Sequence, residues 1–232
     1  KNLNVKELPE LERYILHKIF TLDLSYKENL KNYNFHKLYK ELLNFCTLDL
    51  SSFYFDIRKD VLYCDSKNSQ KRKDCIKVLN LLLDCLLKWF APILVFTTEE
   101  IYNLIEKSDA SVHEMQLPEL KSEFKDNTLA EKWKNLYRIK QEANIAIEEK
   151  RSIKEIGSSL EAEIEIFTSD ENYKLLKKLD LPEYFITSKA KLSKNTTDTK
   201  ETIIKVKKTN GEKCPRCWKI LETECSRCAE FL

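Results

Sequence analysis

Apolar residues recur at three- and four-residue steps in the first part of the chain, and this spacing predicts amphipathic helices. The first stripe consists of Leu8, Leu11, Ile15, Ile19 and Leu22. The second consists of Phe35, Leu38, Leu42, Phe45 and Phe53, and the third of Ile76, Leu79, Leu83, Leu86 and Phe90. From Leu79 to Phe96 the chain is apolar almost all round, which is typical of a helix buried in the middle of a bundle.

Several polar features complete this first region. Asp49 lies on the second apolar stripe, so its carboxylate needs a partner, and Arg58 follows shortly after it. We expect a loop at residues 60–68. Thr97–Glu100 has the sequence of a capping box, which predicts the start of a fourth helix. Amphipathic helices joined by short loops form bundles, so we expect a helix bundle within residues 1–120.

The period of the pattern changes after this region. A long helix is expected from about Thr128 to Arg151, with an apolar stripe made by Leu129, Trp133, Leu136, Ala143 and Ile147. Apolar and acidic residues then alternate from Glu161 to Ile166, which predicts a half-buried strand. Residues 172–179 look helical, 184–187 and 202–207 look like short strands, and 193–200 like a polar loop. The expectation is a mainly α protein with a small α+β unit in residues 121–208.

The last stretch, residues 209–232, carries the clearest chemistry. Cys214 and Cys217 form one C-x-x-C pair, and Cys225 and Cys228 form a second, with seven residues between the pairs. Two such knuckles supply four thiolates to one point, which is the tetrahedral ligand set of a closed, structural zinc site. Two disulfides or a thioredoxin-like redox pair are the alternatives, but no secretory or βαβ pattern accompanies them. We expect one structural Zn²⁺.

Composition narrows the class of protein. The 232 residues carry 40 Lys and Arg against 38 Asp and Glu, a balance that favours a protein touching an anion with part of its surface. No signal peptide or membrane span is apparent. The remaining cysteines are expected to be free and reduced, which points to the cytoplasm. The chain begins at Lys1, not at Met, so we expect a piece of a longer protein.

Glycine and histidine usage argues against a catalytic site. Gly157 and Gly211 are the only two glycines in the sequence, so there is no glycine-rich loop to cradle phosphates. The three histidines are spread through the chain, and none pairs visibly with a nucleophile. We expect no catalytic residue here.

Three stretches together resemble one family. Asn44–Tyr63 resembles the anticodon-binding bundle of bacterial isoleucyl-tRNA synthetases, Ile156–Ala162 the start of their C-terminal junction domain, and Lys213–Trp218 their terminal zinc ribbon. Order and spacing agree along essentially the whole chain. The bundle alone is shared with valyl-, leucyl- and methionyl-tRNA synthetases, whereas Ser51–Tyr54 and the terminal Cys-x-x-Cys-Trp point to the isoleucine enzymes.

The resemblance implies a partner and a role. The HIGH and KMSKS motifs and the editing domain of the family are absent, so the chain corresponds to the tRNA-binding C-terminal part of a class I ligase. It would hold the tRNA(Ile) anticodon stem-loop as a monomer in the cytoplasm. The catalytic domain that binds ATP and attaches isoleucine to the tRNA would lie upstream, and this part alone would be inactive.

RNA affinity comes from Lys and Arg on phosphates, and base recognition from stacking on aromatic or Arg planes. The candidate contacts are Arg58, Lys59, Lys207, Lys208, Lys213, Arg216 and Trp218. Arg58 has an alternative role in an ion pair with Asp49 or Asp56, and Trp218 has one in packing over the zinc site. Two other functions remain open, a zinc-ribbon DNA-binding module like that ending formamidopyrimidine-DNA glycosylases and a protein-interaction bundle with a structural zinc.

Overall fold

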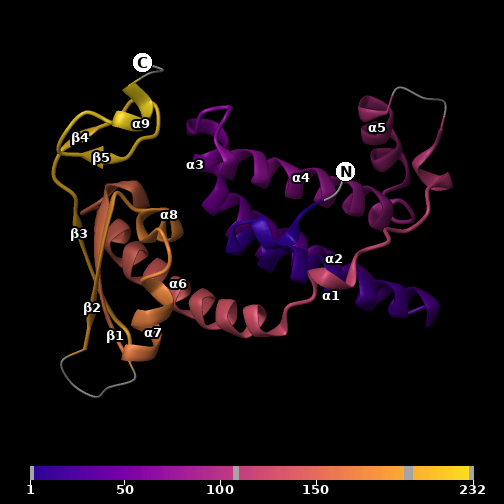
Figure 1. The fold of residues 1–232 in the computed structure, drawn as a ribbon, viewed down its shortest axis with the longest axis horizontal. Coiled ribbons are helices and arrows are strands. Elements are labelled where there is room, and N and C mark those ends of the chain that lie inside the picture. Colours follow the sequence, from indigo (N-terminus) through magenta and orange to yellow (C-terminus); the bar gives the residue numbers. More distant parts are fainter. Residues whose placement is uncertain (1–2, 107–109, 196–200, 230–232) are drawn as a thin grey trace. The chain divides into compact units, whose positions relative to one another are not determined.

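The computed structural model describes residues 3–106, 110–195 and 201–229, in which helices predominate (Figure 1). Packing divides the chain into two units. The first comprises Lys1–Tyr54 and Lys67–Asn127, and the second comprises Phe55–Ser66 and Thr128–Leu232. The contacts of the segment Phe55–Ser66 thus assign it to the same unit as the C-terminal half of the chain. The three-part division expected from the sequence stays a prediction.

All regular secondary structure in the described part of the first unit is helical. Its main helices are α1 (Glu10–Lys31), α2 (Phe35–Asn44), α4 (Gln70–Phe90) and α5 (Val95–Ile105). Helix α2 continues into wider π-type turns over Phe45–Phe55. Short 3₁₀ turns lie at Val5–Glu7, Val112–Glu114 and Ser122–Phe124.

Most residues of the first two apolar stripes are buried in this unit, as the spacing predicted, but Phe35 of the second stripe is exposed and Leu22 of the first is half-buried. Its largest fully buried side chains include Ile15, Leu16, Ile19, Leu42, Leu50, Phe53, Tyr54 and Trp89. The polar atoms of the core find partners: the Trp89 indole donates to Asp23 at 3.3 Å, and the Tyr26 hydroxyl donates to the Trp89 carbonyl at 3.0 Å. Asp49 pairs with Lys18 at 3.1 Å, not with Arg58.

The sequence pattern predicted the wrong buried face for the third helix, α4. The buried face of α4 consists of Cys75, Val78, Leu82, Cys85 and Trp89, whereas Ile76 and Leu83 are exposed. Cysteine packs as a small apolar residue, so two thiols complete a stripe that lies one position away from the predicted one. The helix is therefore amphipathic and not buried all round.

Two boundaries in this region also differ from the prediction. Helix α5 begins at Val95, two residues before Thr97, so the expected capping box does not form. Instead, the Glu99 carboxylate accepts hydrogen bonds from the Ser111 hydroxyl and the Val112 amide, both at 2.9 Å. The loop expected from residue 60 begins only after α3 (Asp56–Cys64) has ended.

The second unit combines helices with a small sheet. Besides α3 it contains α6 (Asn127–Ser152), α7 (Asp170–Leu176), α8 (Leu181–Phe185) and α9 (Ser226–Ala229). Its strands are β1 (Ala162–Thr168), β2 (Lys189–Lys194), β3 (Ile203–Lys208), β4 (Glu212–Lys213) and β5 (Ile220–Leu221). A 3₁₀ turn at Ser159–Glu161 precedes β1. All five predicted stripe residues of α6 are buried, and the polar loop expected at 193–200 lies mostly outside the described residues.

The main sheet has the order β2-β1-β3. Strand β1 runs parallel to β2, pairing Ile164 with Ala190, and antiparallel to β3, pairing Ile164 with Val206. Helices α7 and α8 make the crossover that a parallel pair requires and contact β2 (Figure 1). This βαβ unit was missed, because residues 184–187 were predicted as a strand although α8 covers Tyr184 and Phe185.

Candidate metal centre and adjoining groove

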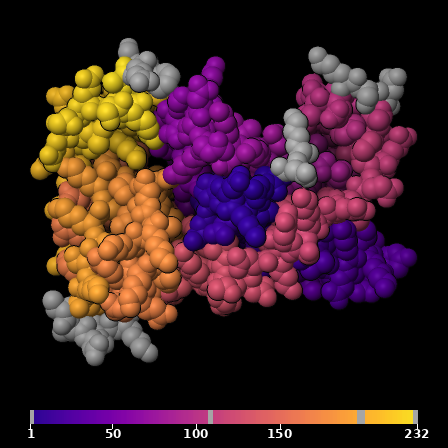
Figure 2. All heavy atoms as spheres, viewed as in Figure 1, coloured from indigo at the N-terminus to yellow at the C-terminus, as the bar shows by residue number. Residues whose placement is uncertain are grey.

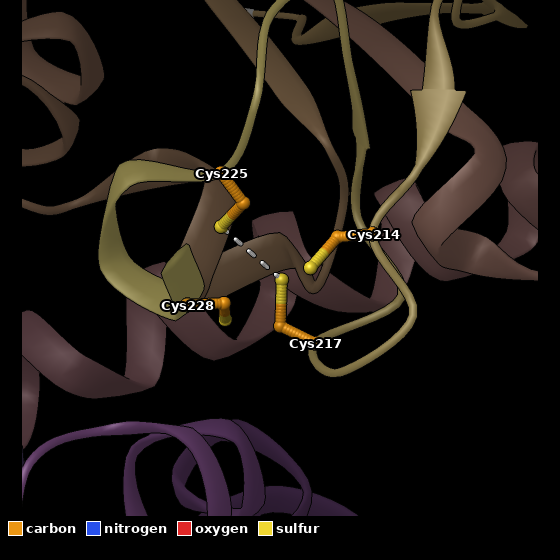
Figure 3. A group of neighbouring side chains, drawn as sticks. All are labelled: Cys214, Cys217, Cys225 and Cys228. Carbon is orange, nitrogen blue, oxygen red and sulfur yellow. Dashed lines mark hydrogen bonds between the residues drawn. The ribbon is translucent and has the colours of Figure 1, made fainter. Parts of the chain in front are cut away.

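The hairpin β4–β5 and helix α9 bring the four predicted cysteines together. Cys214 follows β4, and its amide donates to the Lys219 carbonyl while its carbonyl accepts from the Trp218 amide, both at 2.9 Å. The Cys228 amide donates to the Cys225 carbonyl at 2.9 Å. These tight turns aim the side chains of each pair at a common point (Figure 3).

The four sulfur atoms fit a tetrahedral metal ion. All lie within 4.8 Å of one another, and the Sγ atoms of Cys217 and Cys225 are 3.8 Å apart. A tetrahedron with Zn–S bonds of about 2.3 Å has S–S edges of about 3.8 Å. The described cysteines form no disulfide. Four close, unbonded thiols are therefore suited to hold a metal ion, and a thiolate set of this kind favours zinc.

Backbone amides near Cys214 favour its thiolate form, which is the form that binds a metal ion. Burial alone would raise the pKa of its thiol, but the amide donors at Cys217 and Arg216, together with the thiols of Cys217 and Cys228, outweigh burial and lower the pKa to about 7. A metal binds the thiolate and not the thiol, so a lowered pKa favours binding near neutral pH.

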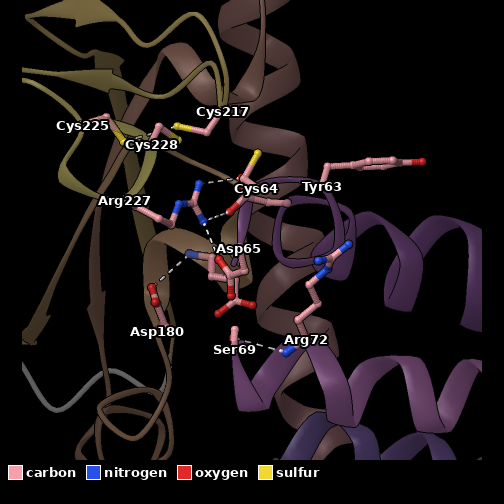
Figure 4. A network of polar contacts seen from close by, with 12 residues as sticks. Tyr63, Cys64, Asp65, Ser69, Arg72, Asp180, Cys217, Cys225, Arg227 and Cys228 are labelled. Carbon is pink, nitrogen blue, oxygen red and sulfur yellow. Dashed lines mark hydrogen bonds and ion pairs between the residues drawn. The ribbon is translucent and has the colours of Figure 1, made fainter. Parts of the chain in front are cut away.

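Two arginines and a fifth cysteine surround the cluster. Arg227 pairs with Asp60 of α3 at 2.6 Å, and the Arg216 guanidinium donates to the Cys64 carbonyl at 2.8 Å. Figure 4 shows Arg227 and Cys64 beside Cys217 and Cys228. Cys64 is packed against the four cysteines but stands outside the metal-ligating group found among the described residues. Burial raises the pKa of its thiol to about 11, and the negative charge of Asp60 acts in the same direction.

A groove of about 370 Å³ adjoins the cluster. It is lined by residues of α3, of the α8 region and of the turn after Cys217, among them Tyr63, Pro182, Ile186, Trp218 and Lys219. Tyr63 and Trp218 are 80% and 60% exposed, so two aromatic faces are available to a ligand. In Figure 2 the cysteine-rich ribbon forms one compact yellow surface that continues from the orange strands and helices of the same unit.

Trp218 owes its position to an unusual backbone conformation. Its φ of 65° lies in the left-handed region, which a non-glycine residue adopts only where the surrounding turn demands it. Lys213 lies over the indole, with Nζ 5.5 Å from the ring centroid. With 60% of its surface exposed, the indole is not enclosed by the knuckle, and the choice between base stacking and packing over the metal site stays a prediction.

The other predicted RNA contacts fall into two groups. Arg58 is buried, and its Nη1 lies 2.6 Å from Oε1 of Glu183, a partner that neither expected ion pair named. Arg216 is half-buried and bonded to backbone carbonyls. Both guanidinium groups therefore have partners within the fold, and their role as RNA contacts stays a prediction.

The predicted lysine contacts are exposed. Lys59 pairs with Asp56 at 2.5 Å, and Lys207 pairs with Glu165 at 3.1 Å. Lys208 and Lys213 lie on β3 and β4. The sequence alone overlooked Tyr63, Lys219 and Arg227, although Tyr63 ends the family-like run and Arg227 lies inside the second cysteine pair, which were the available signals.

None of the described helices combines the length and apolar character needed to span a membrane.

Comparison with known proteins shows which family the chain resembles. A family model described as the anticodon-binding domain of tRNA ligase matches residues 12–166. The chain is 53% identical over 227 residues to an isoleucine–tRNA ligase of Pelagibacter ubique, a match covering 98% of this chain and 25% of that protein. Isoleucine–tRNA ligases of Agrobacterium fabrum and Gluconobacter oxydans are 36% and 37% identical, covering 92% and 97% of this chain and 23% and 24% of theirs.

The chain spans about a quarter of the length of these relatives. The family model covers more than half of the chain, including the main helices of the first unit, α3, α6 and most of β1. On this evidence the chain belongs to the family of tRNA ligase anticodon-binding domains.

Proposed function

We propose that this chain is the tRNA-binding C-terminal region of an isoleucine–tRNA ligase, and that it holds the anticodon stem-loop of tRNA(Ile). The observation that carries the proposal is the 53% identity to an isoleucine–tRNA ligase over 98% of the chain, cysteine ribbon included. A DNA-binding module or a protein-interaction bundle would not account for identity along this whole length.

The groove beside the cysteines suits an unstacked loop base. Proteins read single-stranded RNA by stacking splayed bases on aromatic rings and bonding their edges. Trp218 and Tyr63 supply exposed rings at the groove, and Lys219 supplies a cation on its lining. An anticodon loop presents such bases, whereas the interior of a duplex keeps its bases stacked.

The exposed lysines are assigned to phosphates. Lys213 lies on β4 of the ribbon hairpin and Lys208 at the end of β3 just before it, and no ion pair with a carboxylate is found for either among the described residues. Lys59 and Lys207 are held by Asp56 and by Glu163 and Glu165, so an RNA phosphate must compete with these carboxylates for them. We therefore expect the larger share of binding free energy from Lys208 and Lys213.

The four cysteines would hold one structural Zn²⁺ in this account. The ion, when bound, supplies only crosslinking, because four thiolates leave no open coordination position for chemistry. The first cysteine knuckle, held rigid by the ion, would fix the position of the turn that carries Trp218. Amide donors around Cys214 hold its thiolate ready for the ion.

The rest of the activity is assigned to the remainder of a parent enzyme. There, isoleucine would be activated with ATP and transferred to the tRNA, in the cytoplasm and by a monomer. This chain offers no glycine-rich phosphate loop, so we expect no isoleucine-dependent exchange between pyrophosphate and ATP from it alone.

A filter-binding comparison tests the proposal. The ligands are the tRNA(Ile) anticodon stem-loop, the same stem closed by an unrelated loop, and duplex DNA of equal length. The proposal predicts the tightest binding to the first at a fixed salt concentration. Equal or tighter binding to duplex DNA would favour the DNA-binding module, and no binding to any ligand would favour the protein-interaction bundle.

A further inference from the structure

Arg227 joins the second cysteine pair to helix α3. Its two terminal nitrogens lie 2.6 and 2.9 Å from the two carboxylate oxygens of Asp60, a bidentate pair, and Nη1 is 3.4 Å from Oδ1 of Asp65. Figure 4 shows the guanidinium reaching from the ribbon toward the end of α3. Planar paired contacts of this kind fix orientation as well as distance.

Arg216 makes the corresponding connection from the first cysteine pair. Its Nη1 donates to the Cys64 carbonyl at 2.8 Å, and its Nη2 donates to the Tyr63 carbonyl at 3.3 Å. Helix α3 ends at Cys64, and the last carbonyls of a helix have no partners within the helix. A cation at this end also interacts favourably with the helix dipole. Arg216 thus caps the turn that carries Tyr63.

Both arginines also lie close to the metal-ligating cysteines. Nη1 of Arg216 lies 3.8 Å from Sγ of Cys228, and Arg227 stands between Cys225 and Cys228 in the second cysteine pair. Four thiolates around a divalent cation carry a net negative charge of about two. Two guanidinium groups beside the sulfur atoms offset that charge, as outer hydrogen-bond donors do in other metal sites.

We propose that Arg216 and Arg227 are positioning residues that couple the metal centre to the RNA groove. Each links a cysteine pair to α3, Arg227 through the Asp60 carboxylate and Arg216 through the Tyr63 and Cys64 carbonyls. Helix α3 carries Lys59 and Tyr63, which line the groove. Loss of the metal, or of either arginine, would therefore release the α3 side of the groove and weaken RNA binding without removing any RNA contact.

The inference rests on the proposed function for its RNA readout, but not for its structural readout. Amide exchange of Tyr63–Ser66, compared with and without metal, measures the coupling directly. Arg227→Met and metal removal should each raise that exchange, while exchange in the buried part of α6 stays unchanged. If the wild-type chain bound no RNA and this exchange still responded to metal, only the proposed function would fail.

The RNA experiment separates positioning from direct contact. At equal metal content, Arg227→Met should bind the tRNA(Ile) anticodon stem-loop about tenfold more weakly with an unchanged salt slope. A lost phosphate contact would instead lower that slope by about 0.7–0.9. Arg227→Lys keeps the charge but not the bidentate geometry, so it should restore binding only in part. Lys134→Met, which removes an exposed charge on α6, is the matched control and should bind like the wild type.

Two further measurements complete the test. Transfer of zinc to a chelator should be about tenfold faster in Arg227→Met than in the wild type. The weakening of RNA binding in Asp60→Asn and in Arg227→Met should not add in the double variant, because both remove one contact. Any of three results would overturn the inference: Arg227→Met binds RNA with wild-type affinity, its salt slope falls by about 0.7–0.9, as expected for one lost phosphate contact, or amide exchange of Tyr63–Ser66 is the same with and without metal.

Discussion

Arg58 of α3 and Glu183 of α8 form a buried ion pair, with 2.6 Å between Nη1 and Oε1. Their side chains are only 5% and 9% exposed, so both charges left water when the chain folded. A buried pair is costly to assemble, and it is costlier still to leave one partner alone. The pair therefore ties α3 to α8 in a way that tolerates no single replacement.

Replacing one partner of this pair should destabilise the protein strongly. We expect Glu183→Gln to lower the free energy of unfolding by about 3–5 kcal/mol, because Arg58 keeps its charge in a buried position. Glu131→Gln is the control, since Glu131 and Lys134 form an exposed pair at 4.0 Å worth less than about 1 kcal/mol. Urea denaturation measures both variants, and equal losses in the two would contradict this assignment.

Lys140 predicts an unusual dependence of stability on pH. The ammonium is buried and donates to the Tyr184 carbonyl at 2.7 Å, and burial lowers its pKa to about 8, against a smaller opposing effect of Asp56. The unfolded value is about 10.5. Between these two values the unfolded chain holds a proton that the folded chain has released, so the free energy of unfolding rises with pH.

The comparison with Lys140→Met isolates this effect from other titrating groups. The cost of burying the Lys140 charge is fully present below pH 8 and fades as the pH rises toward 10.5. The wild type should therefore gain stability relative to Lys140→Met over this range, by about 3 kcal/mol in total. Parallel pH profiles for the two proteins, measured by urea denaturation, would show that Lys140 keeps an ordinary pKa.

Gly211 is required by the ribbon hairpin. Its φ is 131°, and a Cβ built there would lie 2.2 Å from the Leu221 carbonyl oxygen, which is backbone and cannot move aside. Gly211→Ala should therefore disturb the β4–β5 pairing and lower zinc content. At Gly157 a Cβ would meet only the flexible Glu161 carboxylate, at 3.1 Å, so Gly157→Ala should retain the metal. Full zinc content in Gly211→Ala would refute the steric argument.

If the four cysteines bind zinc, the protein should contain a fixed amount of it, and losing the ion should affect the ribbon more than the helices. We expect about one zinc per chain, and Cys214→Ser should abolish retention while leaving most of the helical circular dichroism intact. Cys46→Ser replaces a half-buried cysteine of the first unit and should keep the zinc. Elemental analysis decides the matter, and unchelated wild-type protein without zinc would remove the metal from the account.

Regular patterns made the helices and the first strand predictable. The stripes of α1 and α6 and the alternation of β1 each come from one periodic signal within one segment. At α8 the segment 184–187 looked like a strand, but Asp180 caps the helix by accepting from the Glu183 amide at 3.2 Å, and Pro182 lies in its first turn. These local helix signals were present in the sequence and were passed over.

Long-range pairing could not be predicted from one sequence. The four cysteines could be predicted because each C-x-x-C motif is short, local in sequence and typical of metal ligands. Arg58 and Glu183 are 125 positions apart, and Arg227 and Asp60 are 167 apart, with nothing local to link them. Charged residues of both signs are abundant, so the sequence offers many possible partners for each arginine. Only the packing of α3 against α8 and the ribbon selects among them.

We propose that the exposed Trp218 face binds an anticodon loop, and the affinity of Trp218 variants for the tRNA(Ile) anticodon stem-loop tests this role most directly. Zinc content is matched, and binding is measured at several salt concentrations. The wild type, Trp218→Phe and Trp218→Ala all carry a Cβ, so the strain of the backbone at φ 65° is similar in each.

We predict that Trp218→Ala costs about 1–3 kcal/mol of binding free energy, because one stacked base loses its aromatic partner. The salt slope should not change, since no charge is removed, and Trp218→Phe should restore most of the affinity. Unchanged affinity in Trp218→Ala with its zinc fully retained would contradict the account.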